Sequence, residues 1–409
     1  MLTPIRPTGL VVFVVVAAVF GVAYVFITPL LDAPDESAHY WRTDALAHGA
    51  VLPKAVYQHG YTALPGGARE LVTIGGMPRL ERQRPALAVS YIAERVVIRY
   101  PLTYSPLPYA PAAIGCAAGD ALRLRPLFTF YLGRLCNLAA AIALVGLAIR
   151  IRPDAQWIFC ACALMPMTLF LFASFSPDAV TIGTAFVAAA LALAGSPWVI
   201  AAAIALALCK PAYVFVPLLA LAVRGRRVPI VAAVIASAFV GASFVKTTAF
   251  MRPGTDAHQQ IAFVMHHPFI AAAAIAGDLV RRAPLYLDEM IGRLGWLTVA
   301  LPMAVIAGMA ALLVAVAWFA GPGITRLQRL LAALIALASV GVVGLSQYIV
   351  WTPVGAGTLD GVQGRYFIPI LPLILIAVSR PASAPRWLPS IVIAAAAIAN
   401  AAALAALRF

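Results

Sequence analysis

Charge is scarce in this chain, and negative charge is the scarcer sign. Only 11% of the 409 residues are charged, with 15 acidic residues against 29 lysines and arginines, whereas 63% are hydrophobic. A soluble domain has about 25% charged residues, so this composition excludes an ordinary water-soluble fold. It indicates a polytopic α-helical membrane protein, because backbone groups in lipid must be hydrogen-bonded within the spanning segment.

Cysteine is also rare, and its spacing carries no metal or disulfide signal. The cysteines lie in apolar sequence and form no Cys-x-x-Cys pair, at Cys116, Cys136, Cys160, Cys162 and Cys209. A zinc ribbon is therefore excluded, and we interpret these residues as small core side chains. The net charge of +14 does not point to nucleic acid, since most basic residues lie between apolar segments, where they meet lipid headgroups.

Long uncharged runs predict about eleven transmembrane helices. The candidate spans are 10–31, 127–149, 155–173, 179–194, 197–209, 211–223, 228–249, 296–317, 329–350, 366–379 and 387–406. The first is expected to be a retained anchor, because no small-residue cleavage site follows it. Segment 104–121 is also apolar, but its prolines and terminal acid predict a membrane-embedded or interfacial helix rather than a crossing.

The distribution of arginine predicts the orientation, since short cytoplasmic loops are enriched in basic residues. With the N terminus in the cytoplasm, the inner loops collect arginines and a single acid, Asp154. All other acids and all six histidines then face the outer side. Two outer loops are large, 32–126 and 250–295, and their mixed sequence predicts interfacial helices. We therefore expect one membrane domain over 1–409.

The stretch LDAPDESAHYWR, residues 31–42, places acids and a histidine directly after the first apolar segment. If a helix starts here, Asp35 and His39 share one face at i, i+4 spacing. Asp35 and Glu36 are the candidate catalytic carboxylates, because a base would be held at the membrane edge. The alternative is an acidic N-cap of the following helix. Asp178, in ASFSPDAV, has the same two interpretations as a binding residue or a helix start.

Basic residues in apolar sequence are the candidate binding groups. Lys210 interrupts about 25 apolar residues and needs an anionic partner, unless its side chain snorkels to the interface. Arg365 and Tyr366 follow a glycine-rich loop, and a guanidinium suits phosphate, although interfacial Arg/Tyr belts are common. Arg134, inside segment 127–149, is expected to face protein or a cavity.

Two further histidines lie in the second large loop. His266 and His267, with the arginines that follow them, make 250–295 cationic, and we include both histidines among the substrate-binding candidates. Each of these features is weak alone. Their predicted convergence on one side of the membrane supports a functional site there.

The motifs APDESAH, YSPLPY, GRLCN, SFSPDA, CKPAYVF and QGRYFIP, in this order, span most of the chain. In this pattern the chain resembles the GT-C superfamily of integral-membrane glycosyltransferases, and within it a bacterial family of mostly uncharacterised proteins. GT-C enzymes have an acidic motif in the first outer loop, which matches Asp35 and Glu36, and a further acid in the next, which matches Asp178. No sequon-reading motif or soluble C-terminal domain is found, which argues against a protein acceptor.

The resemblance implies an inverting transfer of sugar from a polyprenyl-phosphate donor to a lipid-linked glycan or other envelope acceptor. The site would face outward from the bacterial cytoplasmic (inner) membrane, with Asp35 or Glu36 as general base. No cofactor is required; if a divalent cation, Mg²⁺ or Mn²⁺, is present, Asp35, Glu36 and Asp178 would hold it. The alternative is a lipid or glycan flippase, which also needs cationic cavities. A non-enzymatic scaffold does not explain Lys210 and Arg134.

Overall fold

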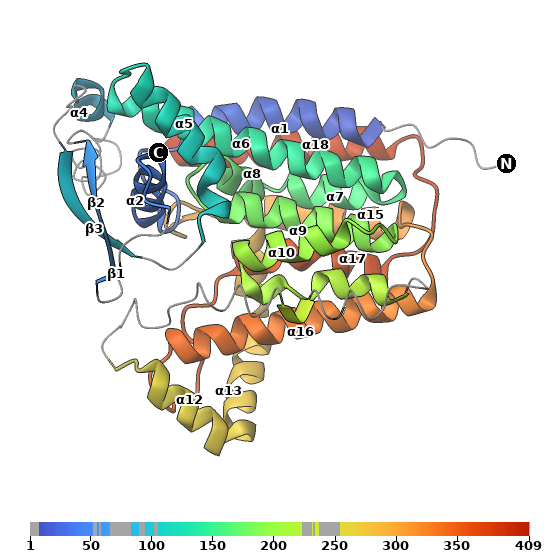
Figure 1. Ribbon diagram of the computed structural model, residues 1–409. Helices are drawn as coiled ribbons and strands as arrows, with labels where there is room; N and C mark the ends of the chain where they lie inside the picture. Colours follow the sequence, from blue (N-terminus) through green and yellow to red (C-terminus); the bar gives the residue numbers. More distant parts are fainter. Residues whose placement is uncertain are drawn as a thin grey trace.

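The computed structural model describes residues 8–51, 55–56, 59–65, 83–89, 95–101, 105–222, 231, 234–236 and 254–408. Within them the chain is mostly helical. Figure 1 shows the long helices side by side in one bundle, with α1 (Thr8–Ile27) and α18 (Leu388–Arg408) along one side and α16 (Arg326–Val350) along the other. The architecture agrees with the predicted all-α membrane class.

Fewer long spans are found than the sequence predicts. In the described part of the chain, four helices are long and apolar enough to cross a membrane: α1, α6 (Pro126–Ile151), α16 and α18. Two bent helix pairs raise this number to six if each is one span. Shorter apolar helices occupy several other candidate spans: α9 (Asp178–Leu193), α10 (Val199–Cys209), η4 (Pro211–Tyr213), η5 (Val216–Ala222), η6 (Gly364–Ile370) and α17 (Leu371–Val378). Candidate 228–249 lies almost wholly outside the described residues, so the number eleven stays a prediction.

Segment 155–173, expected as one span, is broken in the middle. Its parts are η3 (Pro153–Ala155) with α7 (Gln156–Ala163), and α8 (Pro166–Phe172), which meet at 85°. Pro166 causes the break, because proline disfavours a helical conformation in the residue before it, and Met165 is extended. Every residue of α7 and α8 is buried, so the broken segment forms the centre of the bundle.

The first large loop contains a sheet that the sequence analysis did not predict. Strands β1 (Ala55–Val56), β2 (His59–Pro65) and β3 (Arg95–Pro101) form an antiparallel sheet in this order, with Tyr61 opposite Arg99. The β-branched and aromatic residues of RVVIRYP favour a strand. The helices of the loop are α2 (Glu36–Ala47), α4 (Gln83–Ala88), η2 (Leu107–Tyr109) and α5 (Ala110–Ala121). Residues 107–121 of the predicted segment 104–121 are therefore helical, and its position at the membrane stays a prediction.

Helix α5 packs closely along α6, and small residues permit the contact. A Cβ atom on Gly115 would lie 2.6 Å from the backbone oxygen of Leu132. On the facing helix, a Cβ on Gly133 would lie 2.6 Å from the Phe175 ring. The two helices thus approach almost backbone to backbone, which fixes the position of α5 against the bundle.

The second large loop is helical, as predicted. It contains α12 (Ala257–His266), α13 (Pro268–Arg281) and α14 (Ala283–Gly292), and the first two meet at 108°. Strands β4 (Arg293–Leu294) and β5 (Val299–Ala300) then form a tight hairpin, in which Gly295 and Leu297 have positive φ. Because this turn uses residues 293–300, α15 (Met303–Phe319) begins later than the predicted span 296–317.

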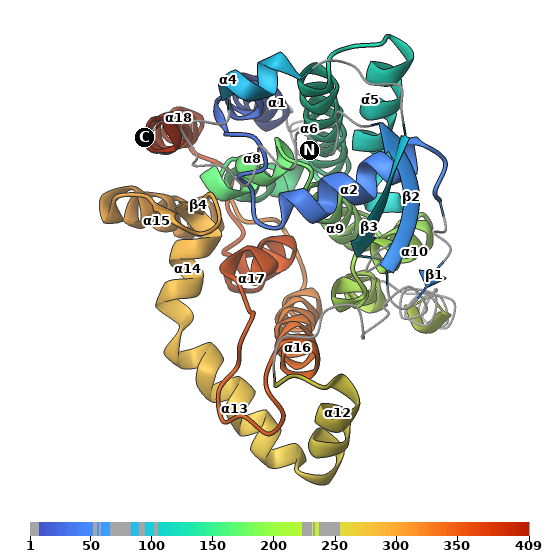
Figure 2. The same cartoon turned by 90° about the vertical axis from the view of Figure 1, so that its left-hand side faces the viewer.

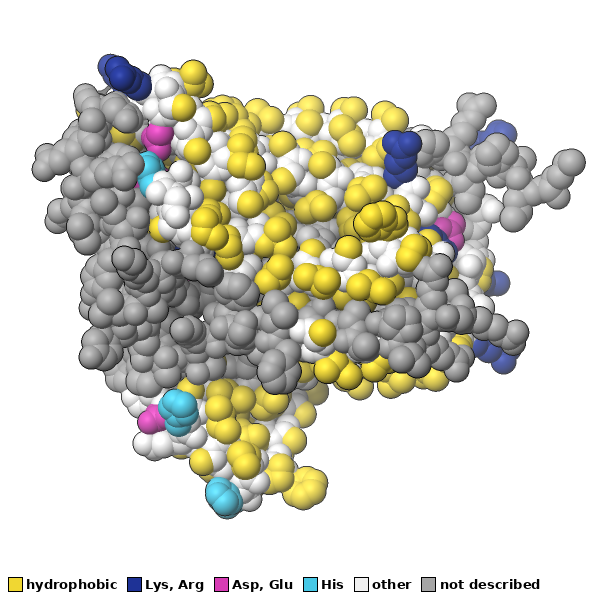
Figure 3. Space-filling model, viewed as in Figure 1, with side chains coloured by type: hydrophobic (Ala, Val, Ile, Leu, Met, Phe, Trp, Pro, Cys, Tyr) yellow, Lys and Arg dark blue, Asp and Glu magenta, His cyan; other side chains and the backbone are white. Residues whose placement is uncertain are grey.

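Apolar side chains dominate the outside of the bundle. Figure 3 shows hydrophobic side chains across the middle of one face, with charged and histidine side chains mainly toward its two ends. Large exposed examples include Val11, Val19 and Leu337, each more than 60% exposed. Such a surface fits hydrocarbon rather than water.

Candidate functional site

The chain turns sharply between α1 and α2, and Asp35 lies at the end of this turn. Leu31 and Asp35 both adopt the left-handed backbone conformation, with φ of 57° and 60°, which costs energy in residues other than glycine. Asp35 occupies the N-cap position of α2, but its side chain makes no capping hydrogen bond. Instead its Oδ2 accepts from Nη2 of Arg365 at 2.9 Å, and the side chain is 51% exposed. The capping interpretation therefore does not describe Asp35.

The neighbouring acid, Glu36, points the opposite way. Its carboxylate is fully buried and forms two hydrogen bonds with Arg134, Nε to Oε1 at 2.9 Å and Nη2 to Oε2 at 2.7 Å. It also accepts from the backbone N–H groups of Ala33 and Phe175. Glu36 thus joins three separate segments, and its lone pairs already have donors.

Arg134, from α6, uses its remaining N–H groups to hold the end of α1. Nη1 donates to the backbone oxygens of Val25 and Thr28, and Nη2 donates to that of Pro29. The residue is completely buried. Every guanidinium nitrogen is therefore engaged within the protein, which favours a structural role over the predicted role in substrate binding.

Asp178, Lys210 and Arg365 converge from three distant parts of the chain. Asp178 is the first residue of α9, and Lys210 follows the last residue of α10. Lys210 Nζ forms a short ion pair with Asp178 Oδ1, and Arg365 Nη1 lies 3.6 Å from Asp178 Oδ2. Lys210 is thus paired and only 14% exposed at its side chain, which argues against snorkelling. Both cations also lie near the Tyr366 ring, at 4.9 Å for Lys210 and 5.3 Å for Arg365.

The backbone before Arg365 is held against α14. Gly364 N–H donates to the buried Glu289 at 2.7 Å, and a Cβ on Gly364 would lie 2.0 Å from the backbone oxygen of Tyr286. Only glycine fits such an approach. The Arg365 guanidinium is then oriented by Gln363, whose Oε1 accepts from Nε at 2.6 Å.

His39 completes the group from one turn into α2. Its Nδ1 lies 3.0 Å from the hydroxyl of Tyr109, and the charges of Asp35, Asp178, Lys210 and Arg365 all act on its ring. Burial lowers the pKa of His39 to about 4, so the imidazole is neutral at pH 7. We call Asp35, His39, Asp178, Lys210 and Arg365 the charge cluster.

The charge cluster joins two carboxylates, two cations and a neutral imidazole. The four charges sum to zero, and each cation has a carboxylate partner. Asp35 is the most exposed of the ion-paired members, whereas Asp178 and Arg365 are nearly buried. Such a site offers a proton acceptor at its mouth and cationic groups behind it, as acid–base and anion-binding chemistry requires.

Two other candidates lie elsewhere. His266 and His267 are exposed at the bend between α12 and α13, which projects from the bundle away from α2 (Figure 2). Among the described residues, neither forms a hydrogen bond or ion pair with the charge cluster. We therefore leave both out of the site.

The predicted cation ligands do not form a metal site together. Glu36 is bound to Arg134, while Asp35 and Asp178 both face Arg365. In the described part of the chain, the group of acids and histidines close enough to hold a metal ion lies elsewhere, at Asp44, His48 and Asp120. Among the described residues, Asp35, Glu36 and Asp178 are therefore not arranged as one three-ligand site.

Several residues that support the charge cluster could not be identified from the sequence. Tyr109 and Gln363 lie within YSPLPY and GVQGRYFIP, but only the fold shows that they contact His39 and Arg365. Glu289 gave no sequence signal beyond its place in a mixed loop. The contacts of these residues arise from tertiary packing, which cannot be inferred from the local sequence pattern.

Comparison with known proteins identifies a family but no characterised relative. Searches of curated proteins and of solved structures found no match. The model of a family of predicted membrane proteins, DUF2142, matches residues 18–374, which include the whole charge cluster. The chain therefore belongs to the DUF2142 family of predicted membrane proteins.

Proposed function

We propose that this protein is an inverting glycosyltransferase of the GT-C type. It transfers a sugar from a polyprenyl-phosphate donor to a lipid-linked glycan or other envelope acceptor, on the extracytoplasmic face of a bacterial cytoplasmic membrane. The observation that carries the proposal is the convergence of Asp35, Asp178, Lys210 and Arg365 at one end of the bundle. Sugar transfer from a lipid phosphate needs this combination of one available base and cations for the leaving phosphate.

Asp35 is the base in this proposal. The two adjacent acids differ in their surroundings, because Glu36 is buried with four donors, whereas Asp35 is half exposed with one described ion-pair partner, Arg365. A base must reach the acceptor hydroxyl at hydrogen-bond distance. Only Asp35 of the pair can do so without breaking the core.

The residues of the charge cluster account for the proton and the leaving group of the transfer step. The acceptor oxygen attacks the anomeric carbon, and its proton passes to Asp35. The bond between that carbon and the phosphate oxygen breaks, and the polyprenyl phosphate leaves with the bonding electrons. Lys210 and Arg365 stabilise the charge that develops on the phosphate. No divalent cation enters this step.

Donor binding would prepare the base. In the structure, Asp35 and Asp178 form ion pairs with Lys210 and Arg365, the cations that would bind the phosphate of the donor. A phosphate on Arg365 would replace Asp35 as a partner, since guanidinium binds phosphate strongly and in a bidentate manner. Asp35 would then be free to accept a proton only after the donor is bound.

An apolar cavity beside α2 offers a place for the lipid part of the donor. It has a volume of about 480 Å³ and is lined by Leu46 and Ala47 of α2 and by Leu107, Ala113 and Ile114 of the η2–α5 segment. Tyr109, which contacts His39, belongs to the same segment. A hydrocarbon chain in this cavity would lie at the C-terminal end of α2, beside the segment that carries Tyr109, the contact partner of His39.

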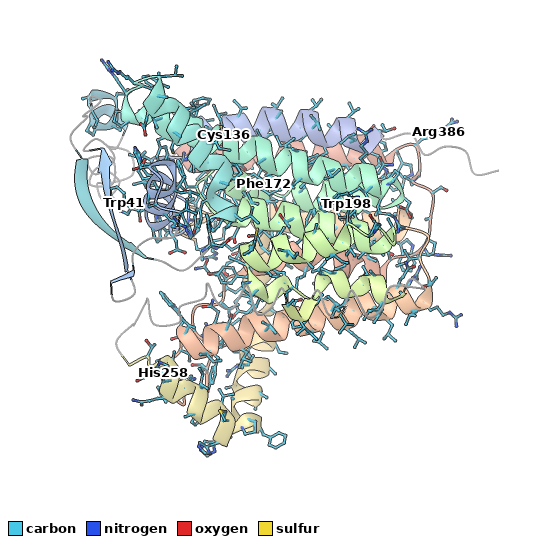
Figure 4. The ribbon with its side chains drawn as sticks, viewed as in Figure 1. Trp41, Cys136, Phe172, Trp198, His258 and Arg386 are labelled. Carbon is cyan, nitrogen blue, oxygen red and sulfur yellow. The ribbon has the colours of Figure 1, made fainter. Side chains whose placement is uncertain are left out.

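The orientation agrees with the distribution of charge along the bundle. Figure 4 shows Arg386 at one end of the bundle and Trp41 and His258 at the other. Arg150, Arg152 and Arg386 lie in the connections predicted to be cytoplasmic. Under the positive-inside rule, the end with α2 faces outward.

The proposal is tested with purified protein and a radiolabelled polyprenyl-phosphate sugar, by measuring release of polyprenyl phosphate. Lys210→Ala and Arg365→Ala should each lower turnover at least about a hundredfold, as removal of an electrostatic stabiliser does. Asp154→Asn removes an acid that pairs with Arg152 away from the site, and it should leave turnover unchanged.

The same preparation separates the enzyme from a flippase. Wild-type protein that moves labelled lipid across proteoliposomes, but releases no polyprenyl phosphate, would contradict the glycosyltransferase and favour transport. Near wild-type turnover in folded Lys210→Ala and Arg365→Ala would remove both cations from the mechanism.

A further inference from the structure

A second polar cluster lies at the far end of α2 from Asp35. Asp44 and His48 are one turn apart at the C-terminal end of α2, and Asp120 lies in the last turn of α5. One ligand atom from each of the three residues can be chosen so that all lie within 4.8 Å of one another. Asp44 lies five residues beyond His39, or about 7.5 Å along α2, and among the described residues no hydrogen bond or ion pair joins this cluster to the charge cluster.

A buried carboxylate oxygen in the cluster lacks a hydrogen-bond donor. Asp44 is 2% exposed, and its Oδ2 accepts no hydrogen bond from the residues that the structure describes, whereas Asp120 Oδ2 lies 3.2 Å from His48 Nε2. A buried carboxylate without compensation is costly. The arrangement therefore calls for a positive group between the oxygens.

The imidazole is oriented as a metal ligand would be. His48 Nδ1 lies 2.7 Å from the backbone oxygen of Asp44, which can only accept, so Nδ1 carries the proton. The lone pair is then on Nε2, which lies 3.2 Å from Asp120 Oδ2. Metal-binding histidines typically donate their other N–H to a backbone carbonyl or carboxylate in this way.

A protonated His48 is the alternative occupant of the cluster. It could donate from Nε2 to Asp120, but it has no further proton for Asp44 Oδ2, because Nδ1–H is used by the backbone. One buried oxygen would stay without a donor. A divalent cation compensates both carboxylates and the Nε2 lone pair together.

We propose that Asp44, His48 and Asp120 bind a divalent transition metal ion, with Zn²⁺ as the best fit. An imidazole nitrogen among the ligands favours zinc over magnesium or calcium, which prefer oxygen ligands alone. Two carboxylates and one histidine provide three protein ligands, and water completes a tetrahedral site.

The bound ion would link α2 to α5. Helix α5 is fixed against α6 through the Gly115 contact, so the ion would anchor the C-terminal end of the helix whose first turn follows Asp35. It would stabilise the position of α2 without taking part in sugar transfer. This inference does not depend on the proposed function.

Zinc content and thermal stability test the site. Purified full-length protein is stripped with a chelator, dialysed against Zn²⁺, and measured by mass spectrometry for metal and by melting temperature. Wild type should retain about one zinc per chain and melt at a higher temperature with zinc than without it. Asp120→Asn and His48→Gln should weaken zinc binding at least about a hundredfold, the upper end of the loss seen for outer-shell partners.

Two control variants test whether the zinc is bound at this cluster and not elsewhere in the chain. Asp35→Asn removes an acid of the charge cluster, and His266→Gln removes an exposed histidine; both should keep the zinc. Binding of Co²⁺, followed by its absorption bands, gives a second measurement. The bands should appear in wild type and be absent from both His48→Gln and Asp120→Asn. A well-folded Asp120→Asn protein then shows the loss of a ligand even if His48→Gln folds poorly. Wild type with no more zinc than Asp120→Asn would overturn the proposal and leave an ion pair between His48 and Asp120.

Discussion

Arg365 Nη2 donates to Asp35 Oδ2 at 2.9 Å, across 330 residues of sequence. The contact joins the turn after the first helix to the start of η6 near the other end of the chain. It keeps a half-exposed carboxylate beside a buried guanidinium that also lies 3.6 Å from Asp178, although most of the surrounding sequence is hydrocarbon. Adjacent to it, Glu36 is buried against Arg134. The two neighbouring acids therefore predict different behaviour in experiments.

Loss of the Glu36–Arg134 pair should destabilise the protein. Arg134→Met leaves the fully buried Glu36 carboxylate without its cation, with only the N–H groups of Ala33 and Phe175 as donors. It also removes the guanidinium donors to the backbone oxygens of Val25 and Thr28, and breaking a buried pair costs about 3–5 kcal/mol. We expect a large fall in the melting temperature in detergent and in the yield of folded protein. Asp35→Asn, one position from the pair, serves as the matched control and should melt near wild type. Equal melting temperatures for Arg134→Met and wild type would contradict the structural role.

His39 predicts a dependence of stability on pH. Its pKa is lowered to about 4 in the fold, against about 6.5 for a free histidine. Between these values the unfolded chain binds more protons than the folded one, so stability falls as the pH decreases from about 6.5 to 4. His39→Gln removes this contribution. The difference in melting temperature between pH 7 and pH 5 should therefore be smaller in His39→Gln than in wild type, and an unchanged difference would show that the ring is not buried as described.

Gly364 should tolerate no side chain. In Gly364→Ala the new methyl group would lie 2.0 Å from the backbone oxygen of Tyr286 and 2.6 Å from the backbone nitrogen of Met290. Overpacking of this kind costs about 1–3 kcal/mol, and it would shift Arg365 away from Asp35. We expect turnover to fall with Gly364→Ala. Gly357→Ala, in the same loop with no atom within 4 Å of the new Cβ, is the control and should keep wild-type turnover.

The topology can be measured by cysteine labelling in intact cells. His258→Cys and Ser383→Cys are exposed positions, the first near the α2 end and the second in the predicted cytoplasmic connection 380–386. A membrane-impermeant reagent should label His258→Cys and leave Ser383→Cys unlabelled until the cells are opened. Cys116, Cys160, Cys162 and Cys209 are buried, whereas Cys136 is partly exposed, so labelling of the unsubstituted protein gives the background to subtract. Labelling of Ser383→Cys in intact cells would contradict the predicted orientation and place this connection outside.

Much of the charge cluster could be predicted from the sequence because charge in apolar sequence is conspicuous. Asp35, Asp178, Lys210 and Arg365 each interrupt or flank a long apolar run, and a charged group there must find a partner. Their pairing is what the structure adds.

The different positions of Asp35 and Glu36 could not be predicted in the same way. Successive residues of a helix point about 100° apart, so the register of one turn decides which acid enters the core. That register is set by Arg134, 98 residues away. The sheet of the first loop could not be predicted for a similar reason, since β2 pairs with β3, a strand distant in the sequence.

The most direct test of the account is the single-turnover rate of sugar transfer in Asp35→Asn. The substitution keeps the shape of the side chain and an oxygen for Arg365 but removes the proton acceptor, so transfer should fall about a hundred- to ten-thousandfold, while binding of the labelled donor is retained. A folded Asp35→Asn protein that transfers sugar at the wild-type rate would contradict the assignment of Asp35 as the base.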